Sequence, residues 1–354
     1  MTLTETLIQG GLLKQLKTPK QFYRTMFGNQ FLSKTDTIVF DEVFEDASQI
    51  SKFVAPNVVS KVNQTKSFDI KTFRPAYAKE KDVIEAWNDT LMSRIAGEAI
   101  GGQYTMAQRA KMVRAYQLSM HRSKMKNLQE YMCFKAFANG ELEIKGEQYP
   151  VSTISYGRNS ALTLSTLGST AWNSNNTFNP LSTIAQVSDL VYEHGDANVD
   201  TIIMGRTAFA ALYSYMSHKD RQHLLDSNIR GSDLAMNLIA AGDVRGVDRV
   251  MSFTGLNGQR IEIYVDNRYY TDEYGVKHRY IADTQLVAFD SQEFKGVMAF
   301  GAIKDKEAGY LPMEMHHKEF TIDEPSADFL LTQSAPLPIV LTPNAVLSIA
   351  DVTK

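Results

Sequence analysis

The sequence predicts an α+β protein, and three stretches of the chain carry that prediction. Short β-type runs fill residues 37–81, from TIVFDEVF to SFDIKTF. Residues 106–138 lack proline and glycine and predict one uninterrupted helix. Helix-type and strand-type patterns then alternate through residues 181–325, which is typical of a mixed domain. A length of 354 residues allows two or three hydrophobic cores.

Composition and charge exclude several classes of protein. The chain is 44% hydrophobic and 22% charged, which is typical of a folded globular protein. Its 37 basic and 40 acidic residues leave a formal net charge of −3, so bulk attraction to nucleic acid or anionic lipid is not expected. The single cysteine, Cys133, excludes an intrachain disulfide and a cysteine-based zinc site. No targeting signal is visible and the most apolar run, residues 335–341, is too short to cross a bilayer, so we expect a soluble protein with no membrane partner.

The first 81 residues predict an arm followed by a hairpin. Residues 1–40 have amphipathic character at Leu7, Ile8, Leu12, Leu13 and Leu16, but no pattern long enough for a core of their own. In residues 41–81, the runs VVSKV and SFDIKTF flank a polar tip at residues 63–66, which is a hairpin pattern. Phe68 and Ile70 share one face of the second arm while Phe73 lies on the other, and a two-stranded ribbon is not stable alone in water. The pattern is compatible with a hairpin inside an ordinary sheet and with one that projects.

The next two segments predict a short helix and a very long one. Residues 82–104 have apolar side chains at helical spacing and end at Gly101 and Gly102, which form a natural hinge. Thr105 and Gln108 then form a capping box at the start of the helix 106–138. At 1.5 Å per residue this helix is about 50 Å long, well beyond the usual mean of about 12 residues.

The long helix is locally basic. Its cations outnumber its only acid, Glu130, and comprise Arg109, Lys111, Arg114, Arg122, Lys124, Lys126 and Lys135. Such a helix can face nucleic acid or an acidic partner, but charge on a helix is more often a solvated face. The sequence leaves both interpretations open.

The second half of the chain predicts a mixed domain and two returning strands. A second hairpin spans residues 141–156, and an amphipathic helix follows around residues 184–191. The run 201–205 predicts a buried strand that leads into a helix with Phe209, Leu212 and Met216 on one face. Residues 261–265 alternate as in an antiparallel strand, with a further turn at Tyr274 and Gly275. The last strands are expected near residues 329–334 and 345–349.

No combination of residues predicts catalysis or a bound cofactor or metal. A phosphate-binding loop needs several glycines at fixed offsets, whereas Met204-Gly205-Arg206 offers one, so Arg206 is expected to be structural. His316, His317 and Glu319 have side chains of the types that bind metals. The two adjacent histidines should point to opposite faces of a predicted strand, so they are not expected to share one metal ion. Cys133 and His121 are twelve positions apart on one helix, about 18 Å, which is too far for a thiol and its base.

Three blocks of sequence give a resemblance instead. They are FRPAYAKEK at residues 73–81, SYGRN at 155–159 with GSTAW at 168–172, and TQSAPLP at 332–338 with Pro343-Asn344. In this order the blocks resemble the lambda-type phage major capsid protein family, phage major capsid protein E. The resemblance implies the Hong Kong 97-like capsid fold and covers nearly the whole chain. It matches least over the first 25 residues.

This resemblance gives the predicted elements names and a function. It implies an N-terminal arm (1–40), an extended loop (41–81), a peripheral domain (82–180) with the spine helix 106–138, an axial domain (181–325) and C-terminal strands (326–354) that return to both domains. The implied function is a structural shell protein that forms hexamers and pentamers around double-stranded DNA, with no catalytic role and no cofactor. Scaffold, portal and decoration proteins are the implied partners, and DNA is held non-specifically. The alternatives are an encapsulin-like compartment protein of the same fold and an unrecognised soluble α/β enzyme.

The resemblance also implies that side chains of the hairpin contact the next subunit. The expected contacts are Val58, Val62, Lys66, Phe68, Ile70 and Phe73. The basic face of the spine helix is expected to lie near the lumen, the alternative being a contact with acidic residues of an adjoining loop. Some relatives on this fold crosslink a lysine to an asparagine, but Lys61 and Lys66 are expected to be solvated and receive no such role.

Overall fold

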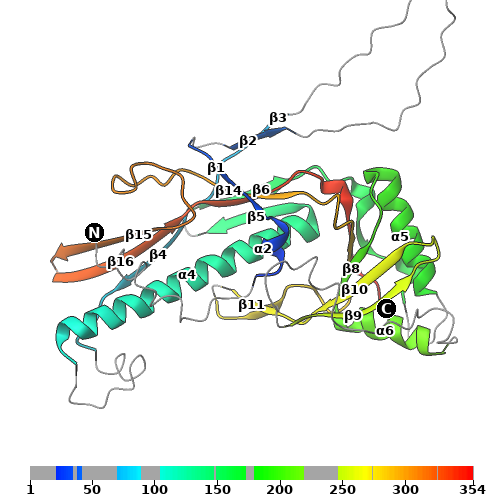
Figure 1. Cartoon of the computed structure of the whole chain (residues 1–354), viewed down its shortest axis with the longest axis horizontal. Coiled ribbons are helices and arrows are strands. Elements are labelled where there is room, and N and C mark those ends of the chain that lie inside the picture. Colours follow the sequence, from blue (N-terminus) through cyan, green and yellow to red (C-terminus); the bar gives the residue numbers. More distant parts are fainter. Residues whose placement is uncertain are drawn as a thin grey trace, which may run out of the picture.

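The computed structural model describes residues 21–34, 38–41, 70–88, 104–146, 149–172, 179–218, 246–272, 274–324 and 326–353. These residues form an elongated molecule (Figure 1). A long helix, α4, runs along one half, and a sheet covered by the helices α5 and α6 lies at the other end.

The spine helix is confirmed almost to the residue. It is α4, Met106–Asn139, and the side chains and backbones of Thr105 and Gln108 form the expected capping box. The helix ends at Gly140, whose left-handed φ of 69° lets its N–H bond the Ala136 carbonyl. A side chain at this position would also collide with Arg158, so glycine is required here for two reasons.

A three-stranded antiparallel sheet lies along the N-terminal half of α4. In sheet order its strands are β15 (His316–Asp323), β16 (Ser326–Ser334) and β4 (Ala78–Val83). The helix expected from residue 82 is therefore wrong at its start: 82–83 belong to β4, and 84–88 contain a turn in which Trp87 is 68% exposed. The helical spacing of the apolar residues wrongly predicts a helix at 82–83, because these residues extend β4, whose partner β16 lies far along the chain. The expected hinge glycines, Gly101 and Gly102, lie outside the described residues.

The end of the expected N-terminal arm belongs to the body of the molecule. Residues 21–34 form α2 (Tyr23–Met26) and β1 (Asn29–Leu32), and Tyr23 and Phe27 are fully buried. Strand β1 pairs in parallel with β14 (Gly296–Phe300), which pairs antiparallel with β17 (Pro336–Val340). Strand β17 tolerates its prolines because it lies at the edge of this sheet. The sequence showed no core here because the partners of these aromatic residues come from distant segments.

The other end of the molecule is a six-stranded sheet, and the predicted elements of residues 181–218 are confirmed. In sheet order the strands are β7 (Thr163–Thr166), β18 (Val346–Asp351), β13 (Leu286–Phe289), β8 (Thr201–Met204), β10 (Arg260–Asp266) and β9 (Val247–Thr254). The helices α5 (Pro180–Gly195) and α6 (Arg206–His218) pack against it. Strands β7 and β18 come from the peripheral and C-terminal stretches, so this sheet joins three parts of the sequence.

Both faces of this sheet are covered. Ile202, Ile263 and Ala288 face the core formed with α5 and α6, while Ile203 and Val287 face the main core around α2 and the end of α4. The alternation expected for residues 261–265 is therefore present, but its polar side is buried too. Glu262 is 4% exposed, and its carboxylate lies 3.0 Å from Arg249 of β9.

The remaining elements are short ribbons and turns of 3₁₀ helix. Two of the ribbons confirm expected turns, namely β5 (Glu141–Gly146) with β6 (Tyr149–Ser155), and β11 (Tyr269–Thr271) with β12 (Lys277–Arg279). A third joins β2 (Ile38–Asp41) to β3 (Ile70–Phe73). The 3₁₀ turns are Ser160–Leu162, Gly168–Thr170 and Pro343–Ala345.

We predict that Phe137→Ala lowers the free energy of unfolding by about 4 kcal/mol, because it leaves a cavity at the junction of α4 and the six-stranded sheet. The Phe137 ring is fully buried and lies edge-on to Phe289 and Phe294, with centroids 5.0 and 5.2 Å away. Urea denaturation of the subunit measures the change. Val151→Ala, at a site 61% exposed, is the control and should cost less than about 0.5 kcal/mol. A loss below about 1 kcal/mol for Phe137→Ala would contradict this packing.

Candidate functional site

The root of the expected extended loop is a short antiparallel ribbon. Ile38 pairs with Phe73 and Asp41 pairs with Ile70, so the residues that flank the segment 42–69 lie side by side. The sequence predicts a hairpin in which residues 58–62 pair with 67–73. In the structure residues 70–73, the described part of the second arm, pair with 38–41 instead. The ribbon thus starts at Ile38, and Ile38 itself is 1% exposed in the main core.

The expected inter-subunit side chains fall mostly beyond this root. Val58, Val62, Lys66 and Phe68 lie outside the described residues, as does Lys61, and Ile70 is described only through its backbone pairing with Asp41. Phe73 is half-buried and packs against the main core of its own chain. It therefore anchors the ribbon within the subunit, and the contacts of the others stay a prediction.

The segment after the ribbon is fastened to a distant loop. Pro75 is buried beside Gly301, where an added Cβ would lie 2.9 Å from the proline ring. The Tyr77 hydroxyl donates to the Ala302 carbonyl and accepts from the Lys304 N–H at 3.2 Å. The proline and tyrosine of FRPAYAKEK thus fix the direction in which the chain leaves the ribbon for β4.

The first six cations of the spine helix, all but Lys135, were expected to form its basic face, but they do not form one solvated face. At about 100° per residue they are distributed around the helix: Lys111 is exposed, Arg109 is 8% exposed, and Arg122 and Lys126 are half-buried. Arg114 Nε lies 3.2 Å from Glu319 on β15, and Lys124 Nζ lies 2.7 Å from Glu80 on β4. Arg114 and Lys124 therefore meet acidic side chains of the same chain, and a lumen-facing position for the others stays a prediction.

Glu130, the acid on this basic helix, is the centre of a buried network that the sequence did not reveal. It is 2% exposed, and its carboxylate accepts the backbone N–H groups of Phe22, Tyr23 and Arg24 at 2.8 to 3.0 Å. Arg268 Nη1 donates to the same carboxylate at 2.8 Å. One side chain thus binds the first turn of α2 to the spine helix.

Asp266 and Tyr23 complete the network. Arg268 donates to both Asp266 oxygens at 2.9 to 3.0 Å, and the Tyr23 hydroxyl donates to Asp266 at 2.8 Å. Burial, followed by the charge of Asp266, raises the pKa of Tyr23 well above its usual value. Burial alone would lower the pKa of Arg268, but the bonds and charges of Asp266 and Glu130 raise it overall. Both carboxylates of the network are therefore hydrogen-bonded, and they share the guanidinium of Arg268.

A hydrogen-bonded relay joins α4 to the three-stranded sheet of β15, β16 and β4, the peripheral sheet. His121, fully buried on α4, lies 3.0 Å from Asp82 of β4 through Nε2 and 2.9 Å from the Thr332 hydroxyl of β16 through Nδ1. Nδ1 of His317 on β15 lies 3.0 Å from the same hydroxyl. Neutral histidines satisfy all of these contacts when His121 Nε2–H donates to Asp82, Thr332 donates to His121, and His317 donates to Thr332.

The blocks at residues 155–172 meet the C-terminal strands in space. Arg158 donates to the carbonyls of Phe137, Ala138 and Pro343, which caps the C-terminus of the spine helix. Burial lowers the pKa of Arg158 to about 10. The Tyr156 hydroxyl donates to the Pro338 carbonyl at 2.5 Å.

Two further bonds extend this junction. The Asn159 N–H donates to the side chain of Asn344 at 2.8 Å. The Trp172 N–H donates to the Val352 carbonyl at 2.7 Å, and the Trp172 side chain is 1% exposed. The second and third blocks of the resemblance thus hold the end of the spine helix and the C-terminal strands together within the subunit.

The residue types considered for catalysis are occupied in structural contacts. Cys133 is fully buried, burial raises its pKa well above the usual value, and its sulfur lies 4.0 Å from that of Met298. The expected structural role of Arg206 is supported by its ion pair with Asp283 at 3.2 Å.

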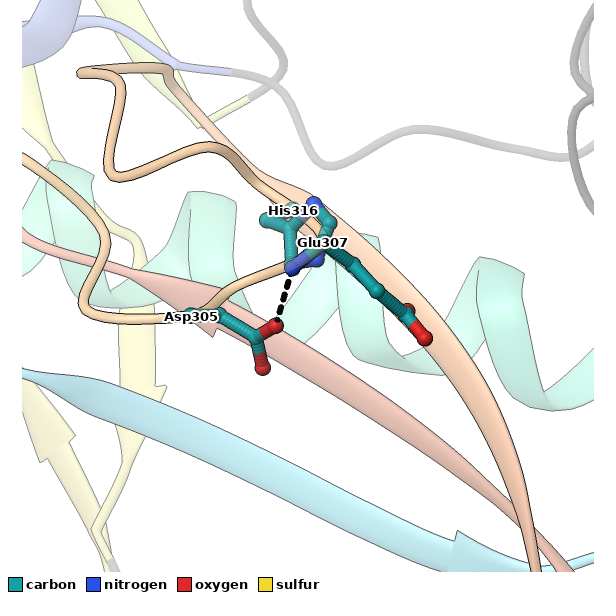
Figure 2. A group of neighbouring side chains, drawn as sticks. All are labelled: Asp305, Glu307 and His316. Atoms are coloured by element: carbon teal, nitrogen blue, oxygen red, sulfur yellow. Dashed lines mark hydrogen bonds between the residues drawn. The ribbon is translucent and has the colours of Figure 1, made fainter.

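One group of acidic and histidine side chains lies near the peripheral sheet. It comprises Asp305, Glu307 and His316, and Figure 2 shows the His316 ring facing Asp305. Lys318 supplies the positive charge, with Nζ 3.2 Å from Asp305 and 3.7 Å from Glu307. One ammonium group thus already pairs with both carboxylates, and we assign no metal to the group.

Comparison with known proteins decides the family. A family model described as phage major capsid protein E matches residues 10–350. The chain belongs to the phage major capsid protein E family. The major capsid protein of Enterobacteria phage P21 is 25% identical over 332 residues, covering 91% of this chain and 92% of the relative. The major capsid protein of Escherichia phage lambda is 20% identical over 342 residues and 95% of each chain.

The fold of this capsid protein is the Hong Kong 97-like fold expected from the resemblance. A crystal structure of the capsid protein of an Escherichia coli CFT073 prophage superposes with a TM-score of 0.70 at 21% identity, covering 98% of both chains. Among the described helices of the capsid protein, none is both long and apolar enough to cross a membrane.

We predict that Glu130→Gln lowers the free energy of unfolding of the capsid subunit by about 3 kcal/mol, because it removes the counter-charge of Arg268 and places an amide donor near backbone donors. Urea denaturation followed by circular dichroism measures the change. The control is Glu80→Gln, which breaks the exposed pair with Lys124 and should cost less than about 1 kcal/mol. Equal losses for the two variants would contradict the role assigned to Glu130.

The relay predicts a pH dependence that belongs to His317. Burial, helped by Arg122, His121 and His316, lowers the pKa of His317 from 6.5 to about 4. Between these values the unfolded chain binds a proton that the folded chain does not, so stability falls as the pH is lowered from 6.5 towards 4. Wild type should lose about 2 kcal/mol more than His317→Asn between pH 7 and 4.5, since asparagine keeps a donor for Thr332 without titrating.

Urea denaturation at the two pH values measures that difference. His194→Asn changes a histidine outside the relay and should keep the wild-type pH dependence. The prediction fails if His317→Asn and wild type lose the same stability on acidification.

Proposed function

We propose that this chain is the major capsid protein of a tailed double-stranded DNA phage and assembles as hexamers and pentamers into an icosahedral shell. Membership of the capsid protein family supports the proposal. The observation that supports it physically is the ribbon root at β2 and β3. These two strands flank residues 42–69 and are paired only with each other in the described part of the chain. A two-stranded ribbon has too little interior to persist alone.

The missing interior is supplied by a neighbouring subunit. The apolar side chains of the ribbon, Val58, Val62, Phe68 and Ile70, pack on the next copy, and the exposed strand edges find backbone partners there. Each contact contributes only a few kcal/mol, but every subunit of a closed shell makes several at once, so breaking one does not release it. Weak bonds thereby give a durable container, and the subunit acts as a structural protein with no catalytic role.

The near-neutral charge of −3 fits containment of DNA without tight binding. A strongly basic interior would bind the duplex and oppose its movement during packaging. The shell forms in the host cytoplasm, first as a procapsid, with scaffold and portal proteins as assembly partners. The mature protein is a component of the virion.

Replacing residues 58–70 by a short glycine-serine linker should leave a folded, soluble subunit that no longer closes shells. Circular dichroism and urea denaturation report the fold, and sedimentation with electron microscopy reports particles, which for wild type should be tens of nanometres across. A length-matched variant with Val58, Val62, Phe68 and Ile70 changed to serine separates the apolar contacts from the backbone, and it should also fail to assemble. Shells of normal yield, or a subunit that no longer folds, would contradict the proposal.

A further inference from the structure

The peripheral sheet places its charges of opposite sign on opposite faces. Figure 1 shows α4 along one side of this sheet. Successive side chains of a strand point to opposite faces, and the register puts Glu80, Asp82 and Glu319 on the side of α4, where they pair with basic side chains of that helix. The strand residues on the other side, which we call the outer face, include no acid. The lysines of the outer face are Lys79, Lys81 and Lys318.

Apolar side chains form the floor of the outer face. All of them are partly or largely exposed, and none belongs to a hydrophobic core formed by the described residues. The Phe320 and Phe329 rings stack with their centroids 5.4 Å apart and their planes 16° apart. The full set is Val83, Phe320, Ile322, Phe329 and Leu331. This floor offers apolar surface that the described part of the subunit does not use.

Lys81 is held over the aromatic part of the floor. Its Nζ lies 4.1 Å from the centroid of the Phe329 ring and 5.1 Å from that of Phe320, which are cation–π distances. The ion pairs of this sheet in the described part of the chain involve neither Lys79 nor Lys81. The ammonium group of Lys81 is therefore positioned beside an apolar floor and is open to a carboxylate.

One end of the outer face shows which kind of segment it accepts. The loop that precedes β15 lies over this end, where Asp305 bonds Lys318 Nζ and the side chain of Gln333, each at 3.2 Å. The same loop buries Ile303 and Ala308 in a small apolar cluster. A segment that combines carboxylates with apolar side chains thus already covers part of the face, and a lysine of the face binds its charge.

We propose that the remaining part of the outer face binds an extended segment of a partner protein that combines carboxylates with apolar side chains. The carboxylates pair with Lys79 and Lys81, and the apolar side chains pack on the floor. Duplex DNA suits the face less well, because phosphates are bound by several cations and gain nothing from an apolar floor. Exposed ion pairs contribute little each, so binding to one subunit is weak. The proposal does not depend on shell formation, since a single subunit carries the whole surface.

Titration of dye-labelled peptides with the full-length, unassembled subunit tests the proposal. The peptide acetyl-EEFVEE-amide should bind below about 1 mM, which corresponds to about 4 kcal/mol. The peptide EESSEE lacks the apolar side chains and should bind at least about tenfold more weakly. The peptide KKFVKK keeps the apolar side chains but meets like charges, and it should also bind at least about tenfold more weakly. Binding of EEFVEE should fall as salt is added.

Lysine variants locate the site. Lys79→Gln with Lys81→Gln should weaken the binding of EEFVEE at least about tenfold, because both ion pairs are lost. The matched control is Lys277→Gln, at an exposed position of β12, which should change binding less than about twofold. Urea denaturation shows whether the variants fold. The comparison of the three peptides needs no variant, so it stays decisive if the double variant folds poorly.

The proposal is overturned if EEFVEE does not bind at about 1 mM, if EESSEE binds equally well, or if the double variant binds like wild type. A duplex DNA of about 20 base pairs gives the remaining outcome. Tighter binding of this DNA than of EEFVEE, lost in the double variant, would assign the face to nucleic acid and overturn the proposal. Photo-crosslinking with benzoylphenylalanine in place of the peptide's phenylalanine should attach the peptide to β4, β15 or β16, and attachment only elsewhere would contradict the assigned surface.

Discussion

The structure depends most on the buried carboxylate of Glu130. A buried carboxylate is costly unless its oxygens are fully hydrogen-bonded, and here three backbone N–H groups and a guanidinium satisfy them. The partners come from two distant places, the start of α2 and Arg268, just after β10, while Glu130 itself lies on the spine helix. Their shared acceptor therefore fixes the N-terminal segment, the helix and the end of the six-stranded sheet relative to one another.

The rest of the subunit is built outward from this junction. The N-terminal half of α4 extends away from this junction. It is bonded to the peripheral sheet through the His121 relay and the ion pairs of Arg114 and Lys124. The C-terminal chain passes through β16, β17 and β18 in turn, so it belongs to all three larger sheets. The two halves of a capsid subunit are thus joined by shared strands. This suits a protein that must keep its shape while it assembles into a shell. The ribbon of β2 and β3 is thus attached to a body whose parts are fixed relative to one another.

Local signals were enough for the elements that the sequence predicted well. The capping box at Thr105, the buried strand β8 and the helix α6 depend on neighbours in sequence, and the structure places them as expected. The errors have a common cause in distant partners. Strand β4 pairs with β16, the aromatic residues of α2 complete a core made by later segments, and Glu130 is paired by Arg268. The only local sign of Glu130 was its isolation as one acid among seven cations, and a single acid reads equally well as part of a solvated face.

We expect the chain between β2 and β3 to complete its structure on a neighbouring copy. Hydrogen exchange of the backbone amides in residues 58–70, compared between dilute subunits and closed shells, tests it most directly. We expect fast exchange in the isolated subunit and strong protection in the shell, while the amides of α4 are protected in both. Equal protection of residues 58–70 in the two states would contradict it, because the ribbon would then belong to the interior of its own subunit.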